Sequence, residues 1–322
     1  MRRPTTWLMG LTAAVALVLL LLGFLVVPRL LHPPLSPVEL QRVASVEKRL
    51  ELRQAQDRLQ ADARATLLQG VAGLLLVIGV IATWRQVRVT REGQITERFA
   101  RAVDHLGSDK PDVRLGGIYT LERIAKDSPP DRRTVVAVLG AFVRNHVPWL
   151  VDAPGGPEHP TPTVDERLSW LQYRAADVQA AMTVLGRRLP SRDPVDLFLS
   201  RIDLRGVHLV GAQLSNAAFR HSNLARSAMD RVNLEASDLG DADLRRAWLV
   251  HARLKGANLS QAHLQDADLR GADLQNANLQ GAHLQGADLS GANLQGARLD
   301  KADLTNVRYD AATLWPAGFQ PS

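Results

Sequence analysis

The residue types that could support metal or acid–base chemistry form a regular series in the C-terminal half of the chain. His263 and His283 lie 20 residues apart, and Asp243 lies another 20 residues before them. Imidazole and carboxylate groups are zinc ligands, and the chain contains no cysteine that could supply thiolate ligands or a thiol nucleophile. The sequence also lacks the G-x-S-x-G, P-loop and H-E-x-x-H patterns. We therefore expect no catalytic residues, and whether the histidines converge depends on the element that positions them.

That element is a sequence repeat with a period of five residues. Every fifth residue from Leu204 to Leu314 is apolar, over 23 consecutive positions. The residue two positions earlier is small, and it is alanine in every repeat from Ala252 to Ala302. A period of five fits neither an α-helix nor a β-strand. It predicts a chain that turns a corner every five residues, with one large and one small residue pointing inward from each side.

The inward residues define the predicted core of this solenoid. The leucines fill the axis, and the small alanines let the wall approach it closely. Representative members of this core are Leu259, Leu264, Leu269, Leu274, Ala267 and Ala272. Trp315 and Phe319 follow the last repeat, and we expect them to cover its final coil while Pro316 blocks further pairing.

The A(D/N)LxX pattern, as in Asn258-Leu259, Asp268-Leu269 and Asn278-Leu279, resembles the pentapeptide-repeat family over residues 202–314. The resemblance implies a right-handed quadrilateral β-helix with four pentapeptides per coil, and a last coil that alternatively forms a homodimer interface. Residues 90–99 and 113–124 resemble membrane-attached, two-span bacterial proteins of this family. That second resemblance implies an architecture and no biochemical activity.

With four pentapeptides per coil, His263 and His283 stack on adjacent coils of one face, one coil beyond Asp243. Stacked positions lie about 4.8 Å apart on a flat face, which converges poorly on one ion. We therefore predict no metal site and no cofactor.

The outward positions supply the candidates for a protein contact. Trp248 stands where the family usually has Asp or Asn, and exposed tryptophan is enriched at binding hot spots. Packing of Trp248 against the nearby helical part is an equally good reading. Arg245 and Arg246 form a charged cluster, and Gln265 with Gln285 forms a ladder whose side chains could simply bond to each other.

Two charge-free runs precede this region, at Trp7–Val27 and Ala65–Trp84. Each is long enough to cross the roughly 30 Å hydrocarbon core of a bilayer as a helix. Two spans make a hairpin with both chain ends on one side, and the flanking arginines divide six to five in favour of cytoplasmic ends. Ser36-Pro37-Val38-Glu39 reads as a capping box that starts a helix leading into the second run.

The whole chain is therefore predicted as an α+β multidomain protein with two transmembrane helices, a short helical region and a β-helix. Amphipathic stripes (Ile95, Phe99, Val103 and Leu106; Ile118, Leu121 and Ala125; Val135, Leu139 and Phe142) predict three short helices, with Asp131 as an N-cap, and a further helix is expected at 175–188. The expected parts are a membrane anchor (1–91), a small helical region (92–147), a linker rich in Pro and Gly (148–168), a helical N-cap of the solenoid (169–201), the repeats (202–314) and a C-terminal tail (315–322).

The net charge of +6 and pI of about 10.1 raise the question of nucleic-acid binding. The repeats, however, carry 13 acidic and 12 basic residues, and the excess of base lies beside the membrane segments. There it suits anionic lipid headgroups or sets topology, so we expect no direct nucleic-acid partner.

These features predict a membrane-anchored, non-catalytic scaffold for protein interactions. We expect it in the cell membrane as a multi-pass protein, with the repeats in the cytoplasm and with an unidentified protein partner besides the bilayer. The alternative is a DNA mimic that inhibits a DNA-binding enzyme such as gyrase, as the resemblance allows. A near-neutral repeat domain disfavours that alternative, because mimicry of duplex DNA needs a strongly negative surface.

Overall fold

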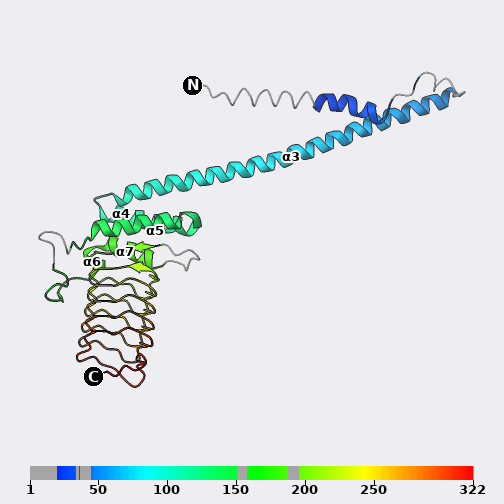
Figure 1. The fold of residues 1–322 in the computed structure, drawn as a ribbon. Coiled ribbons are helices and arrows are strands. Elements are labelled where there is room, and N and C mark those ends of the chain that lie inside the picture. Colours follow the sequence, from blue (N-terminus) through cyan, green and yellow to red (C-terminus); the bar gives the residue numbers. More distant parts are fainter. Residues whose placement is uncertain (1–19, 34–35, 37–44, 151–157, 188–195, 322) are drawn as a thin grey trace. The chain divides into compact units, whose positions relative to one another are not determined.

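The structure is a computed structural model that describes residues 20–33, 36, 45–150, 158–187 and 196–321. The chain divides into two compact units, Met1–Glu92 and Gly93–Ser322, and each is described by itself. The first contains helical segments, and the second contains short helices followed by the stacked coils that Figure 1 shows towards the C-terminus.

The first unit contains the beginning of a long helix, α3 (Val46–Leu106), in which the second charge-free run lies. An 18-residue window of α3 has a mean hydropathy of 2.3, and none of it is buried. Among the described residues this is the one helix long and apolar enough to cross a membrane. The first expected span lies largely outside the described residues, and its end belongs to a shorter apolar helix, Leu20–Leu31. The capping box at 36–39 also lies almost entirely outside them.

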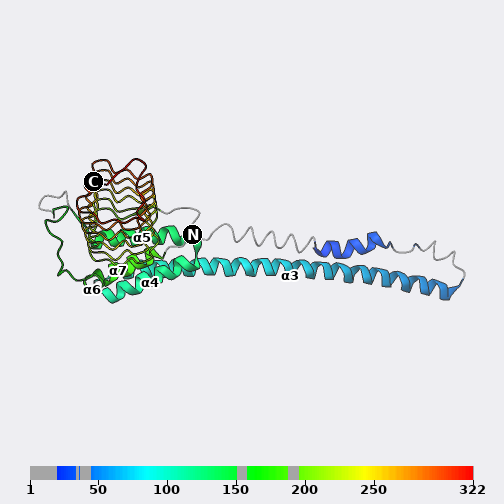
Figure 2. The same cartoon turned by 90° about the horizontal axis from the view of Figure 1, so that it is seen from below.

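The shorter helix packs against the first part of α3. Gln60 Nε2 donates to the carbonyl oxygen of His32 over 2.9 Å, and Gln56 Nε2 donates to that of Pro33. The two helices lie side by side in both Figure 1 and Figure 2. Less exposed residues recur at helical spacing on each of them: Gly23, Val27 and Pro28 on one, and Gln60, Leu67 and Val71 on the other. The pair is therefore an antiparallel hairpin.

The second unit begins with a helical layer. It comprises the end of α3, α4 (Pro111–Asp127), the 3₁₀ turn η1 (Pro129–Asp131), α5 (Arg132–His146), α6 (Leu171–Arg174) and α7 (Ala176–Gly186). The predicted stripes are mostly buried in one core, but Val103 is 38% exposed. Arg114 Nε lies 2.5 Å from the buried Asp177 carboxylate and ties α4 to α7.

Asp131 does not cap α5 through its side chain, contrary to the sequence prediction. Its backbone has φ −83° and ψ −9°, because the residue belongs to η1. An N-cap side chain reaches the next amides from an extended backbone, and this conformation does not present it that way.

The repeats form coils of 20 residues. Residues pair in parallel with the residue 20 positions later along four sides, as in Asp203↔Asn223, His208↔Ala228, Gln213↔Asn233 and Ala218↔Asp238. Four pentapeptides therefore make one coil. The inward leucines and alanines are buried, including Leu259, Leu264, Leu269, Leu274, Ala267 and Ala272.

Each corner between residues 201 and 306 contains a residue with left-handed backbone, two positions after the large inward residue. Glycine takes this position at Gly211 and Gly256, with φ of +68° and +66°, but Ala236 and Arg231 adopt the same conformation. The backbone therefore turns in the same way at each of these corners, whether or not the residue there is a glycine.

The first coil has a partner on each side. On one side the amide of Asp203 donates to Val147 O, and on the next the Gln179 side-chain amide exchanges two hydrogen bonds with the backbone of His208. On the third the amide of Gln213 donates to Gly186 O. On the fourth, β1 (Leu197–Phe198) pairs in parallel with β2 (Ala217–Ala218). The exposed backbone edge that aggregates in open sheets is thus covered at this end.

The other end departs from the predicted phase. Asn293 pairs with Leu314 rather than with the residue before it, so the last coil holds one extra residue. Leu314 consequently takes an outward position and is 45% exposed, while Thr313 is buried where the repeat usually has alanine. The prediction of Leu314 as the last inward residue is wrong. Trp315 packs partly buried on the core and stacks with Phe319 at 5.3 Å between ring centroids.

Candidate interaction surface

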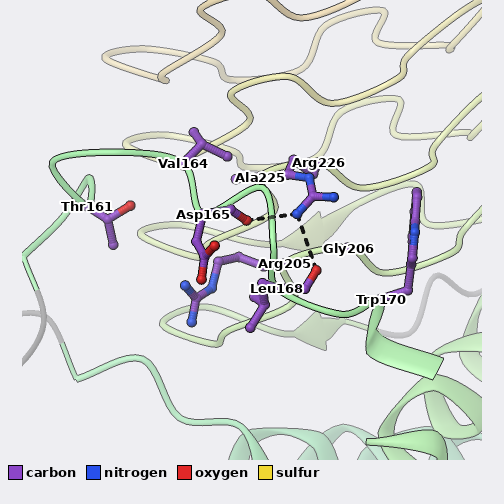
Figure 3. Close-up of a pocket in the computed structure, with 9 residues that line it drawn as sticks. All are labelled: Thr161, Val164, Asp165, Leu168, Trp170, Arg205, Gly206, Ala225 and Arg226. Carbon is purple, nitrogen blue, oxygen red and sulfur yellow. Dashed lines mark hydrogen bonds between the residues drawn. The ribbon is translucent and has the colours of Figure 1, made fainter. Parts of the chain in front are cut away.

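The segment expected as part of a linker lies against the repeat domain over its second half, and residues 158–170 are called the strap below. Arg226 Nη1 donates to the carbonyl oxygens of Asp165 and Leu168 over 2.8 and 3.2 Å. Arg245 Nη2 donates to Thr161 Oγ1 over 2.9 Å. Figure 3 shows Arg226 reaching under the strap in this way. Pro160 and Pro162 keep the strap out of regular structure, and its carbonyl groups, free of helix or sheet bonds, become acceptors for arginine.

Trp248 contacts the strap rather than standing free. Its ring stacks on Trp170 with centroids 5.4 Å apart and planes 14° from parallel. It remains 40% exposed. Packing against the helical part, one of the two readings of this residue, describes its position.

The two candidate arginines are also engaged. Arg245 donates to both carboxylate oxygens of Asp243, from Nε over 2.9 Å and from Nη2 over 2.7 Å. Its side chain is only 11% exposed. Arg246 forms ion pairs with Glu166 of the strap and, at 3.6 Å, with Asp266. These three candidates therefore face an internal partner.

The glutamine candidates, Gln265 and Gln285, lie on the same side of the β-helix as Arg245, one and two coils further along the stack. Gln285 Nε2 donates to the Asp303 carboxylate. The side-chain carbonyl oxygens of Gln265 and Gln285 are buried without a hydrogen-bond partner. A mutual ladder does not satisfy these two oxygens.

His263 and His283 stack face to face, with centroids 4.8 Å apart and planes 2° from parallel. Parallel rings do not point their nitrogens at a common centre, and Arg245 occupies the Asp243 carboxylate. Among the described residues, no group of three or more His, Asp or Glu side chains is arranged to hold a metal ion. Burial, and then the neighbouring His283, lower the pKa of His263 from 6.5 to about 4.

His159 of the strap, which sequence reasoning did not select, joins these histidines. Its ring meets those of His221 and His263 edge to face, at 6.1 and 6.2 Å between centroids. Its Nε2 bonds the carbonyl oxygen of Asp241, and Trp149 Nε1 donates to its Nδ1 over 3.2 Å. No periodic signal in the sequence marks His159, because it lies outside the repeats.

The strap and the first coils enclose a cavity of about 10 Å³, lined by Leu168, Trp170, Arg205 and Arg226 among others (Figure 3). This volume admits about one water molecule and no organic ligand.

The repeat surface neutralises much of its own charge. Eight of the carboxylates in residues 202–314 lie within 4 Å of an arginine of the same domain: Asp203, Glu235, Asp241, Asp243, Asp266, Asp268, Asp288 and Asp300. Because these pairs are distributed over several coils, they do not leave a continuous negative stripe.

Comparison with known proteins identifies the family. A family model described as pentapeptide repeats matches eight copies, at residues 199–235, 237–276 and 272–308. The chain belongs to the pentapeptide-repeat family. None of the curated proteins matches it significantly.

Several solved structures are similar to the repeat domain. HetL, a pentapeptide repeat protein involved in heterocyst differentiation regulation in Nostoc sp. strain PCC 7120, is 32% identical over 38% of this chain and 69% of its own, with a TM-score of 0.27. Rfr23 of Cyanothece 51142 is 34% identical over 39% and 67%, with a TM-score of 0.16. QnrB1, a plasmid-mediated fluoroquinolone resistance protein, is 18% identical over 35% and 77%, with a TM-score of 0.21.

Proposed function

We propose that this protein is a membrane-anchored pentapeptide-repeat protein whose repeat domain is a non-catalytic platform for a protein partner. The observation that carries the anchoring is the charge-free run of α3, none of which is buried among the described residues. Leu76, Val77 and Ile78 are 71%, 56% and 52% exposed. Contiguous apolar surface of this kind marks a membrane or protein contact, and the run has the length that a bilayer requires.

The hairpin in the first unit supports a second span. The contact of Gln60 with His32 sets Ala65 roughly level with Val27 on the two antiparallel helices, since both rise equally per residue. The second charge-free run therefore starts where the first ends. Arg29 and Arg64 flank the runs on that same side, where an interface between lipid and water would accommodate them.

Membrane extraction of two matched variants tests the anchoring. Arginine at the centre of a spanning helix costs about 2.5–3.5 kcal/mol per residue on the insertion scale. We expect the double variant Leu76→Arg/Val77→Arg to be lost from the carbonate-washed membrane fraction. Leu50→Arg/Leu52→Arg changes two exposed apolar residues of α3 outside the run and should leave the protein in that fraction. Retention of both variants would refute anchoring through this run of α3.

Topology needs its own measurement, because the flanking charges are nearly balanced. We propose that the repeat domain lies in the cytoplasm, which predicts low activity for alkaline phosphatase fused to the C-terminus of the full chain. A fusion within residues 45–60 of the connecting segment should be active. High activity of the C-terminal fusion would place the repeats on the other side.

The platform role draws on the rigidity of stacked coils, which hold outward side chains in fixed rows. Proximity labelling from the C-terminus in native membranes should enrich a defined protein relative to an unfused labelling enzyme.

A homodimer is proposed through the last coil, where Tyr309 and Leu314 are 47% and 45% exposed. Tyr309→Asp should then reduce the mass of the detergent-solubilised protein measured by light scattering, and an unchanged mass would exclude this interface.

The DNA-mimic alternative makes a distinct prediction. The paired carboxylates of the repeat domain are a poor substitute for a phosphate backbone. We expect the purified full chain to leave gyrase supercoiling unaffected at micromolar concentration. Inhibition at that concentration would favour mimicry over the platform.

A further inference from the structure

Four imidazoles gather where the strap meets the repeat domain, and they are called the histidine cluster: His159, His221, His263 and His283. One belongs to the strap, His263 and His283 project from adjacent coils, and His221 projects from a coil about two turns before His263. The edge-to-face contacts of His159 with two of the others, and the stack of His263 on His283, connect all four.

The hydrogen bonds of His159 require a neutral ring. Its Nδ1 accepts from the indole N–H of Trp149, so the ring proton sits on Nε2 and is donated to the carbonyl oxygen of Asp241. A second proton would have to occupy Nδ1, which would then face the Trp149 donor without an acceptor. Protonation therefore removes one of the contacts that hold the strap.

Two ion pairs and one further carboxylate lie around the cluster. Arg220 Nη2 lies 3.2 Å from Asp241, whose carboxylate also lies 3.9 Å from His221 Nε2. Arg245 lies 2.7 Å from Asp243, the carboxylate facing His263. Two guanidinium groups thus match two carboxylates, and Asp303, paired with His283 on the next coil, is a third acidic group whose carboxylate accepts from Gln285. Each proton added to the cluster adds a positive charge beside other imidazoles, and such like charges repel.

We propose that the strap is a pH-sensitive clasp, docked while the histidine cluster is neutral and released when the cluster is protonated. Release separates Trp248 from Trp170 and Arg246 from Glu166, and so uncovers the face of the repeat domain that carries the candidate contact residues. This inference does not depend on membrane anchoring or on the identity of a partner.

The pKa of His263 gives the direction and the range of the effect. Its pKa is lowered from 6.5 to about 4 in the docked state, first by burial. Because His159 of the strap contributes to this lowering, release raises the pKa of His263, and docking weakens as the pH falls below 6.5 towards 4. His263 senses this range because His159 of the strap both covers it and adds to the lowering of its pKa.

Hydrogen exchange of the full chain in detergent at pH 7.5 and 5.0 tests the clasp. After correction for intrinsic exchange, amides of residues 158–170 should exchange about tenfold faster at pH 5.0, an effect of the size that a single shifted histidine can produce. Amides of the coils between residues 252 and 292 should keep their protection. Equal strap protection at both pH values would overturn the proposal, as would loss of protection throughout the coils at pH 5.0.

Two variants and one control separate the cluster from acid effects elsewhere. His159→Gln keeps an acceptor and a donor but cannot be protonated, so the strap should lose the part of its pH response that His159 and its effect on the pKa of His263 supply. His221→Gln, which leaves His159 in place, should reduce the response without removing it. His251→Gln changes an exposed corner histidine outside the cluster and should respond like the natural chain. A full response in both cluster variants would overturn the proposal even if one of them folds poorly.

Discussion

At the residue scale, the left-handed corner decides which substitutions the repeat tolerates. Fourteen non-glycine residues of the described chain have positive φ, nearly all of them at repeat corners. A left-handed backbone costs an L-residue about 1–2 kcal/mol. The stacked coils must offset this cost at each corner that lacks glycine. Several of these side chains lie over a glycine of the next coil, as Gln261 lies over Gly281, where a Cβ would come within 2.3 Å of the amide.

Gly211→Ala isolates the conformational part of this cost. A Cβ at Gly211 would meet no atom within 4 Å, so crowding contributes nothing. We expect the free energy of unfolding to fall by about 1 kcal/mol, and Ala236→Gly to raise it by a few tenths, by chemical denaturation in detergent. Equal stability of Gly211→Ala and the natural chain would show that the corner carries no strain.

Ala272→Leu tests the inward small position. Ala272 is 1% exposed among the leucines of the axis, and three extra carbon atoms there force neighbouring side chains or coils apart. We expect a loss of about 1–3 kcal/mol or more in unfolding free energy. Ala312→Leu is the matched control at an exposed alanine and should change stability by less than about 0.5 kcal/mol.

At the element scale, the Arg114–Asp177 ion pair joins helices α4 and α7 of the helical layer. Their side chains are 16% and 5% exposed, so removal of one partner leaves the other buried. Gln179 of the same helix, α7, covers the edge of the first coil. One short helix therefore both closes the helical core and caps the solenoid.

Arg114→Met should destabilise the second unit by about 3–5 kcal/mol, because it leaves the Asp177 carboxylate buried without its cation. The double variant Arg114→Met/Asp177→Leu should recover most of this loss. Thermal unfolding of the three proteins in detergent gives the comparison. A double variant as unstable as the single one would mean that the pair itself, rather than the unpaired charge, is what matters.

At the scale of the whole molecule, the two ends of the solenoid differ. The first coil has backbone or side-chain partners on its four sides, whereas Leu304 and Tyr309 of the last coil are partly or largely exposed. In a stack where each coil contacts its neighbours, stability depends on these terminal interfaces.

Amide exchange at neutral pH should therefore follow a gradient along the stack. We expect the slowest exchange in the coils from 224 to 284, and exchange at least about tenfold faster in residues 299–314, since the last coil opens without disrupting the others. The first coil should resemble the middle. Uniform exchange along the stack would show that it opens only as a single unit, or that a partner covers the last coil.

Much of the second unit could be predicted from the sequence, and the errors have physical causes. Val178, Met182 and Leu185 are buried in α7, two residues shorter than the expected helix at its C-terminal end. Asp131 failed as a cap because a 3₁₀ turn of two prolines had already set its backbone. The extra residue before Leu314 could not be predicted from the five-residue period. An apolar residue follows in either case, Leu314 without the insertion and Trp315 with it.

The five-residue period, which every repeat restates, determined the corners and the inward residues up to Leu304, and the residue count determined the near-neutral charge, whereas the number of pentapeptides per coil came from the family resemblance. Only the tertiary structure decided that residues 158–170 dock on the coils, that Trp248 meets Trp170, and that His159 joins the other histidines. These contacts join a non-repeating segment to positions tens of residues away. They depend on hydrogen bonds and packing between particular side chains, which leave no periodic pattern to read.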